Sequence, residues 1–108
     1  MATLQIPVNG RLASQIMTIP LDGTRYRLKV YYSFRQEIWI LDLQTDRESD
    51  LLVGIKIVPE WGLIARFKIP GLPPGEILAI DTSGQELPPG RNDFGFNRRV
   101  RLVYREAS

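Results

Sequence analysis

The fold of this chain is decided by residues 24–43, TRYRLKVYYSFRQEIWILDL. In the first half, apolar side chains alternate with polar ones, and the apolar face comprises Tyr26, Leu28, Val30 and Tyr32. The opposite face carries the cations Arg25, Arg27 and Lys29. In the second half Trp39, Leu41 and Leu43 share one face, while Ile38 and Ile40 share the opposite face with Asp42, so this strand can be covered on both sides. A period of two is typical of half-buried strands, so the stretch predicts two antiparallel strands, joined through residues 33–36, whose apolar face needs a second sheet.

Similar alternating segments occur along the rest of the chain, at residues 3–8, 51–59, 63–70, 76–81 and 98–105. Turn signals separate them: Asn9-Gly10, Asp22-Gly23 and two copies of LPPG, each of which predicts a type II turn. No stretch of ten or more residues has the 3.6-residue period of a helix. We therefore predict an all-β fold: one domain over residues 1–108, a compact antiparallel β-barrel or β-sandwich of six to eight short strands.

Two segments carry more specific predictions. In residues 51–59 we expect Leu51, Val53, Ile55 and Ile57 to share a face, and Gly54 inside this strand predicts a bulge or a close backbone approach. Residues 1–20 contain Pro20, which cannot donate to a sheet, and so form either an edge strand or an extended arm. Such an arm can pair with its own sheet or with a neighbour's, and its own is favoured because open edges promote aggregation.

Composition removes several functional classes. The 108 residues include no cysteine and no histidine, so the commonest metal ligands and the usual general base near neutral pH are missing. We predict no enzyme activity, no metal and no cofactor. The apolar runs are far shorter than the roughly 20 residues of a transmembrane helix, and the amino terminus lacks a signal peptide. We therefore expect a protein made and used without secretion and without a membrane partner.

The basic side chains form one candidate binding constellation: Arg25, Arg27, Lys29, Arg99, Arg101 and Arg105. If the strands at residues 24–32 and 98–105 were neighbours, their outer faces would form a positive stripe of the kind that binds single-stranded nucleic acid in OB-type barrels. The other interpretation, which we favour, is ordinary solvation of two strand faces. The chain carries no RNP, KH or helix-turn-helix signature, and its net charge is only +2.

Acidic and aromatic residues give weaker candidates. Asp42, Asp81 and Asp93 are the carboxylates nearest to apolar residues, and two of them could form an acid/base pair. We favour structural roles, in which Asp81 caps a strand end and Asp93 lies in an Asx turn. The acidic segment at residues 44–50 lacks the glycine and glutamate of a calcium loop and is interpreted as a solvated turn. Phe94 and Phe96 lie in a turn-rich segment and either anchor it in the core, which we favour, or contact a partner.

A family resemblance emerges from the order of five motifs: YRL at 26–28, WILDL at 39–43, LVGI at 52–55, LPPGE at 72–76 and RVRLVY at 99–104. Each motif is a weak strand or turn pattern, and their succession supplies the specificity. From about Ile19 to Glu106 the chain resembles the cyanophage baseplate plug family, the plug proteins of simple contractile-tail phages. The role of residues 1–18 is left open by this resemblance.

The resemblance implies a virion structural protein of a myophage tail baseplate, which plugs the central channel where the tail tube meets the hub until ejection. Its implied partners are hub, tail tube or initiator subunits and further copies of itself, after assembly in the host cytoplasm. It implies no catalytic residues. Candidate docking surfaces are residues 1–21, the loop with Phe94 and Phe96, and the two turns that contain Pro73, Pro74, Pro88 and Pro89. The alternative function is an OB-like protein that binds single-stranded nucleic acid.

Overall fold

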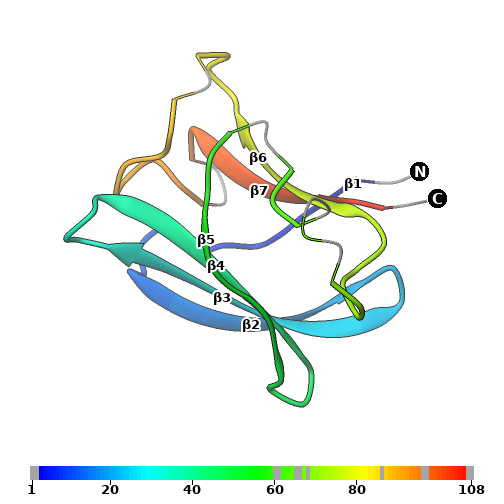
Figure 1. Ribbon diagram of the computed structural model, residues 1–108. Coiled ribbons are helices and arrows are strands. Elements are labelled where there is room, and N and C mark those ends of the chain that lie inside the picture. The colour runs from blue at the N-terminus through cyan, green and yellow to red at the C-terminus, as the bar shows by residue number, and fades with distance from the viewer. Residues whose placement is uncertain are drawn as a thin grey trace.

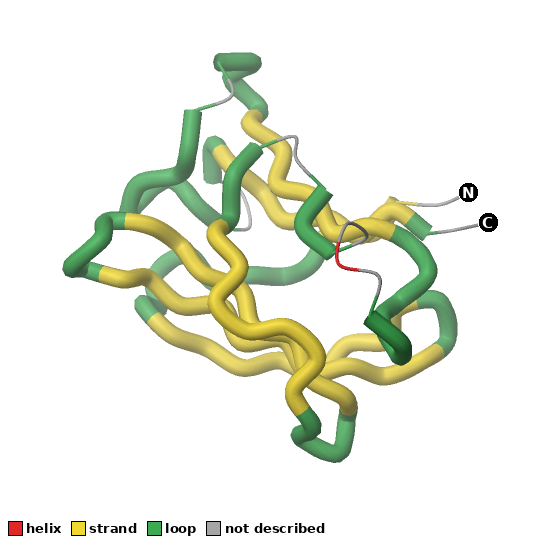
Figure 2. Tube along the Cα trace, viewed as in Figure 1, coloured by secondary structure: helices red, strands yellow, loops and turns green. Residues whose placement is uncertain are grey.

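Two antiparallel sheets face each other in the computed structural model, which describes residues 3–59, 62–64, 67, 69–85, 87–95 and 98–106 (Figure 1). The larger sheet has the order β2 (Ser14–Leu21), β3 (Thr24–Ser33), β4 (Ile38–Thr45) and β5 (Asp50–Lys56). The smaller sheet has the order β1 (Thr3–Gln5), β7 (Val100–Arg105) and β6 (Glu76–Asp81). The predicted all-β class is confirmed, and the sheets form a sandwich rather than a closed barrel (Figure 2).

The central hairpin is present as predicted. Strands β3 and β4 pair antiparallel from Tyr26 opposite Thr45 to Ser33 opposite Ile38. The alternating apolar side chains of both strands are buried, including Leu28, Val30, Trp39, Leu41 and Leu43. Because side chains alternate between the faces of a strand, one face of this hairpin forms the floor of the core.

The smaller sheet packs on this face of the hairpin through alternating apolar side chains of its own. Ile77 and Ala79 of β6 and Val100, Leu102 and Tyr104 of β7 are fully buried. Burial of apolar surface contributes roughly 25 cal/mol per Å², so two facing apolar layers supply the main stabilising free energy of the fold.

Within the described residues there is no helix long and apolar enough to span a membrane.

The turn between β2 and β3 follows the sequence signal. Asp22 and Gly23 have φ angles of 52° and 84°, as a two-residue type I′ hairpin requires. The predicted type II turns at the two LPPG segments are wrong, because neither Gly75 nor Gly90 has the positive φ that such a turn needs at this position. Gly75 is required instead for close approach, since an added Cβ would overlap the Tyr104 hydroxyl and the carbonyl oxygen of Arg105.

The predicted face of β5 is also wrong, because the strand is bulged. Leu41 lies opposite Ile55, whereas Leu43 lies opposite Leu52, so β5 has one more residue than β4 over this interval. The extra residue lies at Gly54, whose φ is 75°. As a result Leu52 and Ile55 are both buried, while Val53 is 60% exposed.

The predicted strand at residues 63–70 is not found. None of the described residues in this range belongs to a strand, and positions 65, 66 and 68 lie outside the described residues. Leu63 and Ile64 are both fully buried instead of alternating. The N–H of Leu63 donates to the carbonyl oxygen of Ile77 at 3.0 Å, and Pro59 forms an isolated bridge with Ala79. This segment therefore lies against the outer edge of β6.

Candidate functional site

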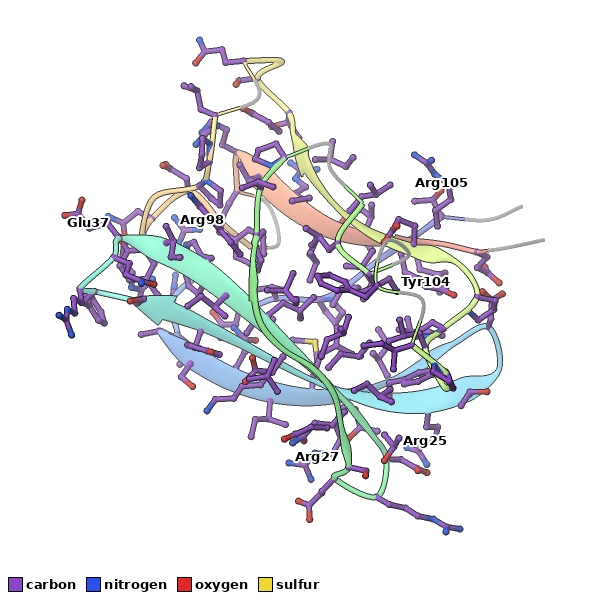
Figure 3. The ribbon with its side chains drawn as sticks, in the orientation of Figure 1. Arg25, Arg27, Glu37, Arg98, Tyr104 and Arg105 are labelled. Atoms are coloured by element: carbon purple, nitrogen blue, oxygen red, sulfur yellow. The ribbon has the colours of Figure 1, made fainter. Side chains whose placement is uncertain are left out.

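The basic residues are divided between the two sheets. Strand β3 pairs with β2 and β4 in the larger sheet, whereas β7 pairs with β1 and β6 in the smaller one. Figure 3 shows Arg25 and Arg27 on the outer side of the larger sheet and Arg105 at the opposite side of the molecule. The two strands are therefore not neighbours, and the positive stripe that the OB-like alternative requires is not assembled.

Two of the three cations of β3, Arg27 and Lys29, have local partners. Arg27 forms an ion pair with Glu48 at 2.6 Å. Lys29 lies over the ring of Tyr31, 5.0 Å from its centroid, and lies opposite Asp42 in the sheet register. Both arrangements are ordinary ways to solvate the outer face of a sheet. These residues therefore support the interpretation as a solvated face.

The cations near β7 behave in the same way. Arg101 is half-buried, and its Nε donates to the carbonyl oxygen of Arg98 at 3.1 Å. Arg105 is exposed and lies opposite Glu76 in the register. Arg99 lies just before β7, and its guanidinium contacts the loop that follows β6. It is therefore part of a structural cluster rather than an outward-facing surface.

That cluster centres on the Arg99–Asp81 ion pair. Arg99 Nη1 lies 2.7 Å from Asp81 Oδ2, and Nη2 lies 3.5 Å from Asp93 Oδ2. The same guanidinium donates to the carbonyl oxygens of Leu87 and Pro88, both at 3.2 Å. One side chain thus fixes residues 87–93 against the ends of β6 and β7.

Asp81 is a structural carboxylate, as predicted. It is 4% exposed and accepts hydrogen bonds from the hydroxyl and N–H of Ser83 and from the N–H of Leu87. The Ser83 hydroxyl is the largest cause that lowers the pKa of Asp81 to about 2, with further contributions from these N–H groups and Arg99, while burial opposes them. A carboxyl group that is ionised at neutral pH and fully bonded is unsuited to general acid catalysis.

The other two carboxylates also have structural partners. Asp93 Oδ2 accepts from the N–H of Gly90 at 3.0 Å, which closes a turn that runs backwards from Asp93 rather than the expected Asx turn. Asp42 Oδ1 accepts from the N–H of Gly54 at 2.8 Å and so holds the bulge of β5. Within the described ranges no three carboxylates lie close enough to hold a metal ion.

The loop that contains Phe94 is anchored in the core. Phe94 is fully buried, and its ring centroid lies 5.1 Å from that of Trp39. Trp39 in turn donates from Nε1 to the carbonyl oxygen of Gly90 at 2.8 Å. Phe94 is therefore not a docking residue, because no part of its side chain reaches solvent. Phe96 lies outside the described residues.

Each proline pair presents one ring to solvent. Pro73 and Pro89 are buried, whereas Pro74 and Pro88 are exposed. Leu87, next to Pro88, is 51% exposed. Of the four candidate prolines, Pro74 and Pro88 are the two that a neighbouring subunit can reach.

The most exposed aromatic side chain in the described part of the chain is one that sequence reasoning passed over. Phe34 is 69% exposed at the tip between β3 and β4. Its ring meets that of Tyr32 edge-to-face at 5.0 Å, and Tyr32 meets Trp39 at 5.3 Å. This row connects the exposed ring to the core and limits its motion. An aromatic residue inside the polar turn SFRQ is the sequence signal that could have identified it.

Comparison with known proteins decides the family. A family model described as "Cyanophage baseplate Pam3 plug gp18" matches residues 3–107. The chain belongs to this cyanophage baseplate plug family. No curated protein matches it. Membership makes the chain a structural component of the phage tail baseplate, and it confirms the family that the sequence motifs predicted. The match also includes residues 3–18, which lie outside the region of the motif-based resemblance.

Proposed function

We propose that this protein closes the central channel of the baseplate where the tail tube meets the hub, and that it is displaced at ejection. The observation that carries the proposal is the plug-family match over residues 3–107. The protein acts in this role without catalysis. In support, Asp42, Asp81 and Asp93 all serve as hydrogen-bond acceptors that hold loops or bulges in place.

A plug has to resist deformation, and its loops are held accordingly. Arg99 contacts residues 87–93 three times and Asp81 at the end of β6 once, as described above. Arg91 adds a second link, because its guanidinium donates at 2.9 Å to the carbonyl oxygens of Gly10 and Arg11 and lies over the ring of Trp39. Loops fixed on both sides present the same surface to each neighbour, which reduces the entropy lost on docking.

The partners in this proposal are hub, tail tube or initiator subunits and further copies of the chain, joined after synthesis in the host cytoplasm. Phe34 is the strongest docking candidate, since a rigid exposed aromatic ring is a frequent anchor in protein interfaces. Pro74, Pro88 and Leu87 offer smaller apolar contacts. We expect contacts of modest area, because a plug has to be displaced at ejection.

Imaging of intact particles tests the proposal. Cryo-electron microscopy of wild-type particles should place the density of this chain inside the channel at the junction of tube and hub. Particles made without the protein should show an open channel there and a raised fraction of empty capsids. Density for the chain at the baseplate periphery, with the channel closed by another protein, would refute the proposal.

A pair of variants tests the docking surface. Phe34→Ala should lower the amount of the protein in purified baseplates, whereas Val53→Ala, which truncates a similarly exposed apolar side chain on β5, should not. Equal incorporation of both variants would remove Phe34 from the interface.

A further inference from the structure

The outer edge of β2 has unpaired main-chain groups. The N–H of Tyr32 donates to the carbonyl oxygen of Ala13 at 2.7 Å, which makes these two residues a hydrogen-bonded pair. Because such pairs recur at every second residue, the odd-numbered residues of β2 bond to β3 along the continuous register. The N–H and C=O groups of Ser14, Ile16 and Thr18 therefore lie on the side of β2 opposite to β3 and point outward in the plane of the sheet. Pro20, which has no N–H, occupies the next outward position.

The other three sheet edges are protected. The edge of β5 is broken by the bulge at Gly54 and by a second register shift between Leu43 and Gln44 of its partner strand. The edge of β6 is covered by Pro59 and Leu63. The edge strand β1 is only three residues long. Among the described strands, β2 is thus the one long edge with an unbroken register, and within the described residues no main-chain partner is found along it.

Apart from Pro20, the side chains of β2 also lack the usual protection. Its sequence, SQIMTIPL, contains no charged residue, although charges are a common means of preventing edge pairing. Ile16 is 56% exposed on the outer face. Met17 and Ile19 pack against the core but are only partly buried. A further strand added here would cover apolar surface on both faces.

We propose that β2 pairs with β2 of a second copy of this chain, antiparallel across a two-fold axis at Ile16. In this register Ile16 lies opposite Ile16 of the partner, and Ser14 lies opposite Thr18. All outward N–H and C=O groups of these three residues then form hydrogen bonds, and Pro20 lies just beyond the paired segment. A second copy is the favoured occupant because an uncharged strand meets no like charge when it pairs with itself, and β-branched and hydroxyl side chains pair well across strands.

This inference rests on the self-association included in the proposed function, and it does not depend on channel closure. A strand of this length buries less than the roughly 1,200 Å² of a stable interface, so the pair is weak in dilute solution. It forms where the local concentration is high, as in a baseplate that holds several copies. Trapping the pair covalently is therefore the appropriate test.

The absence of cysteine makes that test direct. In the purified full-length protein, Ile16→Cys introduces a single thiol whose Cα would lie about 5.5 Å from its symmetry mate, within the range of a disulfide. Val53→Cys is the matched control, since Val53 is 60% exposed on the bulged edge strand. Both variants are oxidised with diamide over a range of protein concentrations, and the dimer fraction is measured by non-reducing gel electrophoresis.

The expected result is a dimer fraction several-fold higher for Ile16→Cys than for Val53→Cys. Adding Thr18→Pro to Ile16→Cys should remove this excess, because the proline deletes an outward N–H while the main-chain hydrogen bonds to β3 stay intact. Circular dichroism verifies that this double variant is folded. Equal dimer fractions for the two cysteine variants would overturn the proposal, and so would an excess that survives Thr18→Pro in the folded protein. A peripheral position of the chain in the particle would refute channel closure alone.

Discussion

The hydroxyl of Tyr104 links the two sheets, and its removal should destabilise the whole sandwich. Tyr104 is fully buried on β7. Its hydroxyl donates to Asp22 in the turn between β2 and β3, at 2.5 Å, and accepts from the N–H of Gly75 at 2.8 Å. The substitution Tyr104→Phe keeps the ring and deletes both hydrogen bonds. It therefore isolates the contribution of this link from that of core packing.

The size of the effect follows from the two bonds. A hydrogen bond to a carboxylate contributes about 1.5–3 kcal/mol and one to a buried N–H about 1 kcal/mol, so the total loss is about 3 kcal/mol. For a chain of 108 residues, the usual unfolding entropy converts this to about 4 °C per kcal/mol. We expect the Tm to fall by about 10–15 °C.

Urea denaturation and calorimetry measure this loss directly. Tyr32→Phe is the matched control, because within the described residues the Tyr32 hydroxyl makes no hydrogen bond, and its stability should stay within about 0.5 kcal/mol of wild type. Burial and the bond to Asp22 raise the pKa of Tyr104, so its contribution is complete below about pH 10, where an unfolded tyrosine titrates, and declines at higher pH. A loss in Tyr104→Phe no larger than in the control would refute the link.

Three further predictions concern Asp81 in the cluster around Arg99, the bulge at Gly54, and the residues Phe94 and Phe34. The pKa of Asp81 is lowered to about 2, so its contribution to stability is complete above about pH 4 and is lost as the pH falls towards 2. The variant Asp81→Asn should therefore have a lower Tm than wild type at neutral pH. Its Tm should also change less than that of wild type between pH 4 and pH 2. A similar acid dependence in both proteins would contradict this role. Gly54→Ala should cost about 1–2 kcal/mol in urea denaturation, purely from the backbone at φ 75°, because an added Cβ meets nothing within 4 Å. An unchanged midpoint would show that the bulge relaxes. Phe94→Ala should lose about 3–5 kcal/mol, whereas Phe34→Ala should stay within about 0.5 kcal/mol of wild type; the reverse order would exchange their assigned roles.

Much of the fold follows from alternation in the sequence. Residues 24–32, 39–43, 76–81 and 100–105 all lie in strands, and the faces that the sequence predicted to be apolar are largely buried in each. Alternation failed where the backbone departs from regular pleating. At β5 the bulge at Gly54 exchanged the faces of Leu52 and Val53, because one extra residue inverts the pattern. The sequence indicated a bulge there but not its consequence for the side chains.

The candidate surface was harder to predict than the fold, since it depends on which strands are neighbours. Alternation places Arg25 and Arg105 on strand faces but does not assign the two strands to different sheets. Phe94 and Phe34 illustrate the same difficulty. Both are aromatic residues in turn segments, and the exposure of one and burial of the other depend on the long-range contact between Phe94 and Trp39.

The bulge at Gly54 also limits how large an assembly this sheet can build. A sheet with two pairing-competent edges adds copies at both ends and grows into an open fibre. In the proposed β2 pair, the register shifts of β5 disfavour addition of a further strand at the other edge, so growth through the larger sheet would stop at two chains.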